Sequence, residues 1–184
     1  MKIAKYLREE NICEHLLYMW QVEDTLRAYG LDEERIQREY VSRFGFSEDE
    51  ARETAEWYAN LVRMMREEGC QEKGHLQINQ GTLSMLSDLH AELLRSLKHA
   101  YYSAAYYKAL PFIVELRAKA AKGKGDKEVG EVETCLNCLY GVMLLRAQHR
   151  EISQETTQAV EAISRLMGML ADAWRKDKAG ELEL

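Results

Sequence analysis

The chain has 184 residues, enough to bury one substantial hydrophobic core, and its 46% apolar and 30% charged residues are ordinary globular values. A net charge of −6, from 25 basic and 31 acidic side chains, argues against broad attraction to nucleic acid or anionic lipid. The N-terminus lacks an apolar signal segment, and no apolar run approaches the ~20 residues of a membrane span. We therefore expect a cytoplasmic protein without membrane association, whose four cysteines stay reduced.

The composition favours helices over strands. The sequence has a single proline and is rich in lysine, glutamate, arginine, leucine and alanine. Neither an internal repeat nor a second composition regime divides the chain. The sequence therefore predicts one all-α domain over residues 1–184, a bundle of six to seven helices, in which residues 175–184 form a polar, frayed tail.

Three helices are predicted in the N-terminal part, over about residues 3–29, 32–44 and 47–69. The second has Asp32 as its N-cap, and the third begins with the capping box Ser47–Glu50. Each predicted helix is followed by a glycine that can adopt the left-handed conformation of a C-terminal cap: Gly30, Gly45 and Gly69.

A connection over residues 70–80 precedes a long helix, which we expect to run without interruption to Pro111. The proline is expected to kink or restart the helix, because it removes a backbone donor and clashes one turn back. The 3-4 spacing of the long helix predicts lengthwise packing on its neighbours. The residues of this stripe are Leu83, Leu86, His90, Leu93, Leu97, Ala100, Ala104 and Tyr107.

The segment CLNCLYGVMLL (Cys135–Leu145) is the most apolar stretch of the chain. A helix that is apolar on every side is normally buried on every side, so we predict a central buried helix over about residues 127–149. The lysine- and glycine-rich residues 119–127 are interpreted as a flexible loop, with Asp126 as the cap of the central helix. Ser153 is expected to begin a last amphipathic helix.

Two stretches resemble a family of small bacterial helical proteins that is catalogued as a domain of unknown function. The resemblance is carried by LLYMWQVEDTLRAYGLD (Leu16 to Asp32) and ETCLNCLYGVMLLRAQHREIS (Glu133 to Ser153), and it extends over nearly the whole chain. It implies an all-helical fold, and neither an activity nor catalytic residues are assigned to the family.

Cys135 and Cys138 form a CxxC motif, but it lies about two turns inside an apolar helix. Reactive CxxC pairs lie at helix N-termini, where the thiol pKa is lowered, and a zinc site requires four ligands. Glu72 and His75 have the Glu-x-x-His spacing of bundle metal sites, but Gly74 and the loop context argue against one. We therefore interpret these cysteines as packing residues and expect neither metal nor cofactor.

Carboxylates that recur every three residues along a predicted helix raise the alternative of a magnesium-dependent nucleotide pyrophosphohydrolase. Glu50, Glu53 and Glu56 have this spacing in the third predicted helix. Such sites resemble an E-x-x-E pair facing an E-x-x-D pair, and no downstream E-x-x-D follows here. A solvated acidic face is the better explanation.

Glu23 falls near the middle of the apolar stripe of the first helix. A carboxylate that faces a core must find a partner or become protonated. Our hypothesis is that Glu23 pairs with Arg27, with Arg146, or with both. The functional alternative is an active-site carboxylate.

The segment KHAYYSAAYYK (Lys98 to Lys108) interleaves basic residues with four tyrosines. Tyrosines can stack on bases, but in an acidic chain they favour packing or self-association over nucleic acid. The function is therefore expected to be a non-enzymatic interaction or scaffold role, with a homodimer or another protein partner. The alternative is a small-ligand-binding or hydrolytic protein with an inter-helix pocket formed by Glu23, His90 and Arg146.

Overall fold

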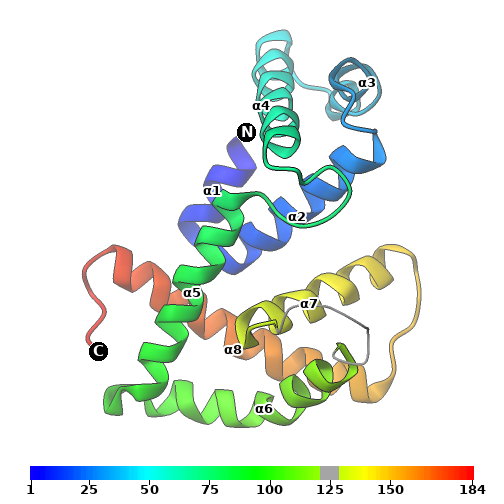
Figure 1. Cartoon of the computed structure of the whole chain (residues 1–184). Helices are drawn as coiled ribbons and strands as arrows, with labels where there is room; N and C mark the ends of the chain where they lie inside the picture. The colour runs from blue at the N-terminus through cyan, green and yellow to red at the C-terminus, as the bar shows by residue number, and fades with distance from the viewer. Residues whose placement is uncertain (121–128) are drawn as a thin grey trace. The chain divides into compact units, whose positions relative to one another are not determined.

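The computed structural model describes residues 1–120 and 129–184, and in these ranges the chain is all-α, with eight α-helices, two short 3₁₀ helices and no strand (Figure 1). This confirms the predicted fold class, with slightly more helices than the predicted six to seven. No helix of the described ranges is long and apolar enough to cross a bilayer. The helices are α1 (Lys2–Glu10), α2 (Ile12–Ala28), α3 (Glu33–Glu39), η1 (Val41–Phe44), α4 (Glu48–Glu67), α5 (Gln77–Arg95), η2 (Leu97–His99), α6 (Ala100–Ala120), α7 (Glu131–Ala147) and α8 (Gln154–Lys178).

The described residues form two compact units. Unit 1 comprises Met1–Arg8 and Glu14–Gly81, and unit 2 comprises Glu9–Cys13 and Thr82–Leu184. The single domain expected over residues 1–184 stays a prediction. Asp126 and most of the expected loop at residues 119–127 lie outside the described residues.

Unit 1 has its own hydrophobic core. The core joins the apolar face of α2 to α3, η1 and α4, and Leu76 closes it at the start of α5. Leu26, Tyr58 and Val62 are fully or almost fully buried in it. These residues are the apolar stripes that the helical periodicity predicts, so the local pattern determines which faces meet.

Unit 2 is built around α6, α7 and α8, which pack against one another. Figure 1 shows α7 and α8 crossing close together, with α6 alongside them. The core consists of aliphatic side chains from all three helices, including Ile113, Leu136, Ile163 and Leu170, each fully buried. The expected tail at 175–184 is shorter than predicted, because α8 continues to Lys178.

The predicted central helix is shorter and less buried in the structure than the sequence indicates. It runs from Glu131 to Ala147 rather than over 127–149 and begins after Gly130. Cys135, Leu136 and Val142 are buried, but Asn137 is exposed and Leu144 is 38% exposed. The prediction of burial on every side was wrong because the neighbours of α7 cover only part of it, and apolar atoms make up much of any protein surface.

Two helices that the sequence predicts as continuous are interrupted at short polar side chains. The predicted helix over 3–29 is divided at Asn11, whose side chain accepts a hydrogen bond from the Cys13 N–H at 3.1 Å. The predicted long helix is divided at Ser96, whose hydroxyl accepts from the Lys98 N–H at 3.2 Å. Such side chains offer the backbone an alternative to the helical hydrogen bond. Conversely, Pro111 lies inside α6, which continues past it to Ala120.

The predicted caps at Gly30, Ser47 and Ser153 are confirmed. The Ser47 hydroxyl accepts from the Glu50 N–H at 3.4 Å, and the Ser153 hydroxyl accepts from the Thr156 N–H at 3.1 Å. Gly30 follows α2 with a φ of 68°, a left-handed conformation that glycine adopts without strain. These ends were predictable because a cap depends only on nearby residues.

We expect Ser153→Ala to lower the free energy of unfolding by about 1 kcal/mol, because the first turn of α8 loses a hydrogen-bond acceptor. Chemical denaturation measures this difference. Ser153→Asp keeps an acceptor at the same place and is expected to unfold close to the wild type. Equal losses in both variants would contradict the capping role.

Candidate functional site

Glu23 is the most deeply buried charged residue of unit 1. It is 1% exposed and lies on the face of α2 that also contributes Met19 and Leu26 to the core. Its burial agrees with its position on the apolar stripe. A carboxylate in such a place requires hydrogen-bond donors, and the fold supplies three.

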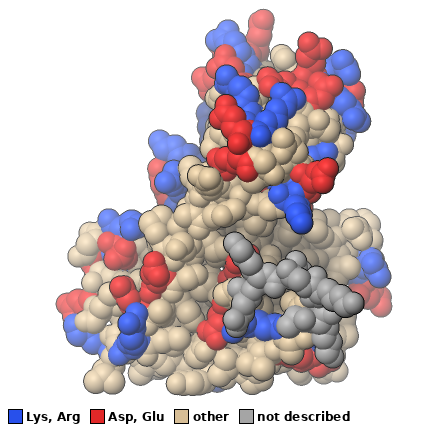
Figure 2. Space-filling view, viewed as in Figure 1, with Lys and Arg blue, Asp and Glu red and all other residues tan. Residues whose placement is uncertain are grey.

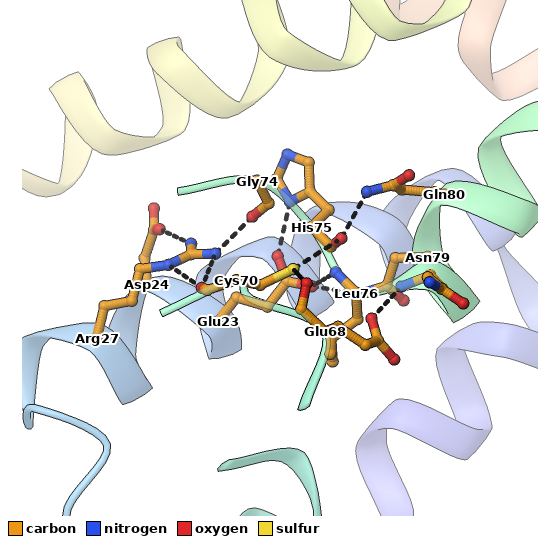
Figure 3. A network of polar contacts seen from close by, with 11 residues as sticks. Glu23, Asp24, Arg27, Glu68, Cys70, Gly74, His75, Leu76, Asn79 and Gln80 are labelled. Atoms are coloured by element: carbon orange, nitrogen blue, oxygen red, sulfur yellow. Dashed lines mark hydrogen bonds and ion pairs between the residues drawn. The ribbon is translucent and has the colours of Figure 1, made fainter. Parts of the chain in front are cut away.

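All three donors come from the connection between α4 and α5 and from the first turn of α5 (Figure 3). His75 Nδ1–H donates to Oε2 of Glu23 at 2.6 Å. The Leu76 N–H and the Asn79 side-chain amide donate to Oε1 at 3.0 and 2.7 Å. Glu23, which lies on α2, thus caps the N-terminus of α5. The dipole of α5 favours negative charge at this end.

The same connection is held by further polar contacts. A second carboxylate, Glu68, accepts from the Gln77 N–H at 2.6 Å, so two acidic side chains cap α5. Arg27 donates to the carbonyl oxygens of Cys70 and Gly74 at 3.1 and 2.5 Å. Figure 3 shows these groups converging on the connection between α4 and α5. The network therefore fixes the path of the chain between the two helices.

His75 completes a carboxylate–imidazole pair, and sequence reasoning did not identify it as a partner of Glu23. Its ring stacks on Trp20, with 4.5 Å between centroids and 19° between planes, and its side chain is 28% exposed. Its position in a connection without helical periodicity gives no signal about which helix it contacts. A carboxylate that orients an imidazole is also part of many hydrolytic sites, but the thiol of this network, Cys70, donates to the backbone carbonyl of His75 at 3.4 Å rather than to the imidazole. Burial also raises the pKa of the Cys70 thiol, which disfavours the nucleophilic thiolate.

Unit 2 contains a second network, centred on the buried His90. His90 Nδ1 lies 2.6 Å from the Tyr102 hydroxyl, and Nε2 lies 3.4 Å from Oε2 of Glu131. The Tyr106 hydroxyl donates to the other Glu131 oxygen at 3.2 Å. A neutral imidazole protonated at Nε2 satisfies each contact, because Tyr102 then donates to Nδ1 and Nε2–H donates to Glu131.

The residues predicted to share one pocket fall in different units. Glu23 belongs to unit 1, whereas His90 and Arg146 belong to unit 2, where Arg146 is exposed near the end of α7. The predicted pairing of Glu23 with Arg27 was wrong: the Arg27 side chain pairs with Asp24 at 2.8 Å and with backbone carbonyls. A pocket that contains Glu23, His90 and Arg146 stays a prediction.

The cysteines have the environment of packing residues. Burial raises the pKa of Cys135 to about 12 and also raises the pKa of Cys138, which keeps both thiols protonated at neutral pH. None of the four cysteines, all of which the structure describes, forms a disulfide. Within residues 1–120 and 129–184, no group of three or more His, Cys, Asp or Glu side chains is placed to hold a metal ion.

The fold and these networks define an all-α protein with internally paired polar groups. The family model "Domain of unknown function (DUF4924)" matches residues 1–181, so the chain belongs to this family. No curated protein and no solved structure gives a significant match.

Glu23→Leu is expected to lower the free energy of unfolding by roughly 3–5 kcal/mol, because Leu76, His75 and Asn79 lose their shared acceptor in the core. Glu23→Gln keeps an oxygen for Leu76 and Asn79, and its amide can donate to the Nδ1 of a neutral His75. Its loss is expected to be about 1 kcal/mol. Chemical denaturation of both variants measures the difference, and equal losses would contradict the capping role.

The stability of unit 2 is expected to depend on pH through His90. Burial lowers the pKa of His90 below its ordinary value of 6.5, while Glu131 opposes this shift. Between 6.5 and the lower folded-state pKa, the unfolded chain binds more protons, so the free energy of unfolding falls as the pH drops.

In His90→Gln, stability is expected to fall less between about pH 7.5 and about pH 5.5 than in the wild type, as measured by denaturant unfolding. His15, whose pKa burial also lowers, is present in both proteins and cancels in the comparison. An identical fall in both proteins would show that His90 is not the group responsible.

Proposed function

We propose that this protein is a non-enzymatic interaction or scaffold protein of the cytoplasm, and that α6 is its docking helix. Four cysteines outside disulfides support a reducing compartment, and an acidic net charge supports a protein partner rather than nucleic acid. The observation that carries the proposal is a continuous apolar face of α6 that is exposed to solvent.

We call this face the α6 seam. Its seven residues, the first in η2 and the other six on α6, recur at alternating spacings of three and four and all are exposed: Leu97, Ala100, Ala104, Tyr107, Pro111, Val114 and Ala118. Leu97 is 99%, Tyr107 67% and Val114 57% exposed. Figure 2 shows few charged side chains on the visible surface over α6, compared with the dense charges over α3 and α4. The sequence predicts packing for four of these residues, but the described neighbours do not cover them.

The opposite face of α6 is already packed. Tyr102, Ala105, Ala109 and Ile113 are buried, and α6 contacts α7 and α8. A helix that is apolar on two faces is normally covered on both, and monomeric proteins rarely expose a long contiguous apolar patch. Because this buried face already holds the backbone of α6 in place, the seam can dock on another helix at little cost in conformational entropy.

The alternative, a ligand-binding or hydrolytic site around Glu23, His90 and Arg146, has weaker support. Both oxygens of Glu23 and both ring nitrogens of His90 already bond to protein groups. A ligand would have to displace these bonds at a cost of about 1–3 kcal/mol for each buried group left unpaired.

A photo-crosslinking amino acid at Tyr107 is expected to give a discrete covalent protein adduct in the native host cell. The same group at Gln37, an exposed polar position of α3, is the matched control and is expected to give none. Adding Val114→Lys to the Tyr107 variant is expected to abolish the adduct, because a charge then lies in the seam. Denaturing electrophoresis with an antibody to the chain measures the adduct.

Failure to crosslink at Tyr107, or equal crosslinking at Tyr107 and Gln37, would contradict a docking role of α6. Persistence of the adduct in the Val114→Lys background would contradict it as well.

A further inference from the structure

We propose that the partner of the α6 seam is a second copy of this chain, whose α6 lies antiparallel to the first across a two-fold axis. This inference rests on the proposed function and names its partner. The argument uses the spacing of the seam, the charges at its edge and the symmetry of dimers.

The spacing of the seam is that of a helix that pairs with another helix. Its 3-4 alternation begins at Leu97 in η2 and continues along α6 from Ala100 to Ala118, where each seam residue occupies an a or d position of a heptad. α6 has 21 residues, which at about 1.5 Å per residue gives a length of ~31 Å. The seam contains both large residues (Leu97, Tyr107, Val114) and alanines (Ala100, Ala104, Ala118), so one such surface can interdigitate with another.

The charges beside the seam are complementary to themselves. Lys108 and Glu115 are both exposed and lie seven positions apart, at the e position of successive heptads and hence on the same edge of α6. In an antiparallel pair of helices, the e edge of one helix lies beside the e edge of the other. Lys108 of each copy can then face Glu115 of the other copy, and the two-fold axis makes this contact twice.

A parallel pair has no such match. There, an e position faces a g position of the other helix, and the relevant g residues are Ser103 and Leu110. Glu115 is already paired within its own helix, with Lys119 at 2.5 Å, which holds the carboxylate beside the seam. The pattern of charge therefore selects the antiparallel arrangement.

Sedimentation equilibrium of the full chain tests the inference. The wild type is expected to reach twice the chain mass of 21.3 kDa as its concentration increases. Val114→Lys is expected to raise the dimer Kd by at least about 30-fold, the effect of losing one well-packed interface residue. Met85→Lys, at an exposed apolar position of α5 outside the seam, is the matched control and is expected to leave the Kd within about 2-fold, an ordinary effect of surface substitution.

Charge exchange tests the antiparallel arrangement. Lys108→Glu and Glu115→Lys are each expected to raise the Kd about 5-fold or more, because each places like charges across the two-fold axis. The double variant restores both opposite-charge contacts and is expected to return the Kd to near the wild-type value. All four substituted positions, 85, 108, 114 and 115, are exposed, so we expect every variant to fold. Melting temperature and far-UV circular dichroism verify this.

A double variant as weak as the single variants would overturn the antiparallel arrangement. A wild-type protein that stays monomeric at all concentrations would contradict the proposal that a second copy of the chain is the partner. In that case, the Tyr107 crosslink separates the two proposals: an adduct with a different protein keeps the docking role of α6, and the absence of any adduct removes both.

Discussion

The apolar surface of α6 is the constraint on which our interpretation of this protein depends. Burial of apolar surface stabilises a fold by roughly 25 cal/mol per Å², but a helix buries only the faces that its neighbours reach. α7 and α8 cover the side of Ala109 and Ile113. Tyr107 and Val114 lie on the uncovered side. The proposed dimer buries this second side without any change to the core of unit 2.

A different principle orders the connection between α4 and α5. The N-terminus of a helix attracts anions, and here two of the chain's own carboxylates, Glu23 and Glu68, occupy that place on α5. His75 and Asn79 bind the same carboxylate of Glu23. The Glu23 carboxylate thus specifies one path of the chain between α4 and α5, and both of its oxygens already accept hydrogen bonds from the protein. This is the physical reason to favour an interaction role over catalysis at Glu23.

Local features of this fold were predictable from the sequence, whereas tertiary ones were not. Helix caps such as Ser153 depend on residues within one turn, and the burial of Glu23 follows from its place on an apolar stripe. Its partner His75 lies 52 positions further along the chain, and periodicity does not say which segments meet. Ser96 is compatible with either a continuous or an interrupted helix, and tertiary packing decides. For the same reason the sequence identified the α6 stripe as apolar but not that its Tyr107 side would be exposed.

The most direct test of the α6 seam as a self-association surface is hydroxyl-radical footprinting at increasing protein concentration. Tyr107 and Tyr6 are both exposed in the structure, and Tyr6 lies on α1, outside the seam. Our account predicts that oxidation of Tyr107 slows as dimers form, while oxidation of Tyr6 stays constant. Oxidation of Tyr107 at the same rate at every concentration would contradict it.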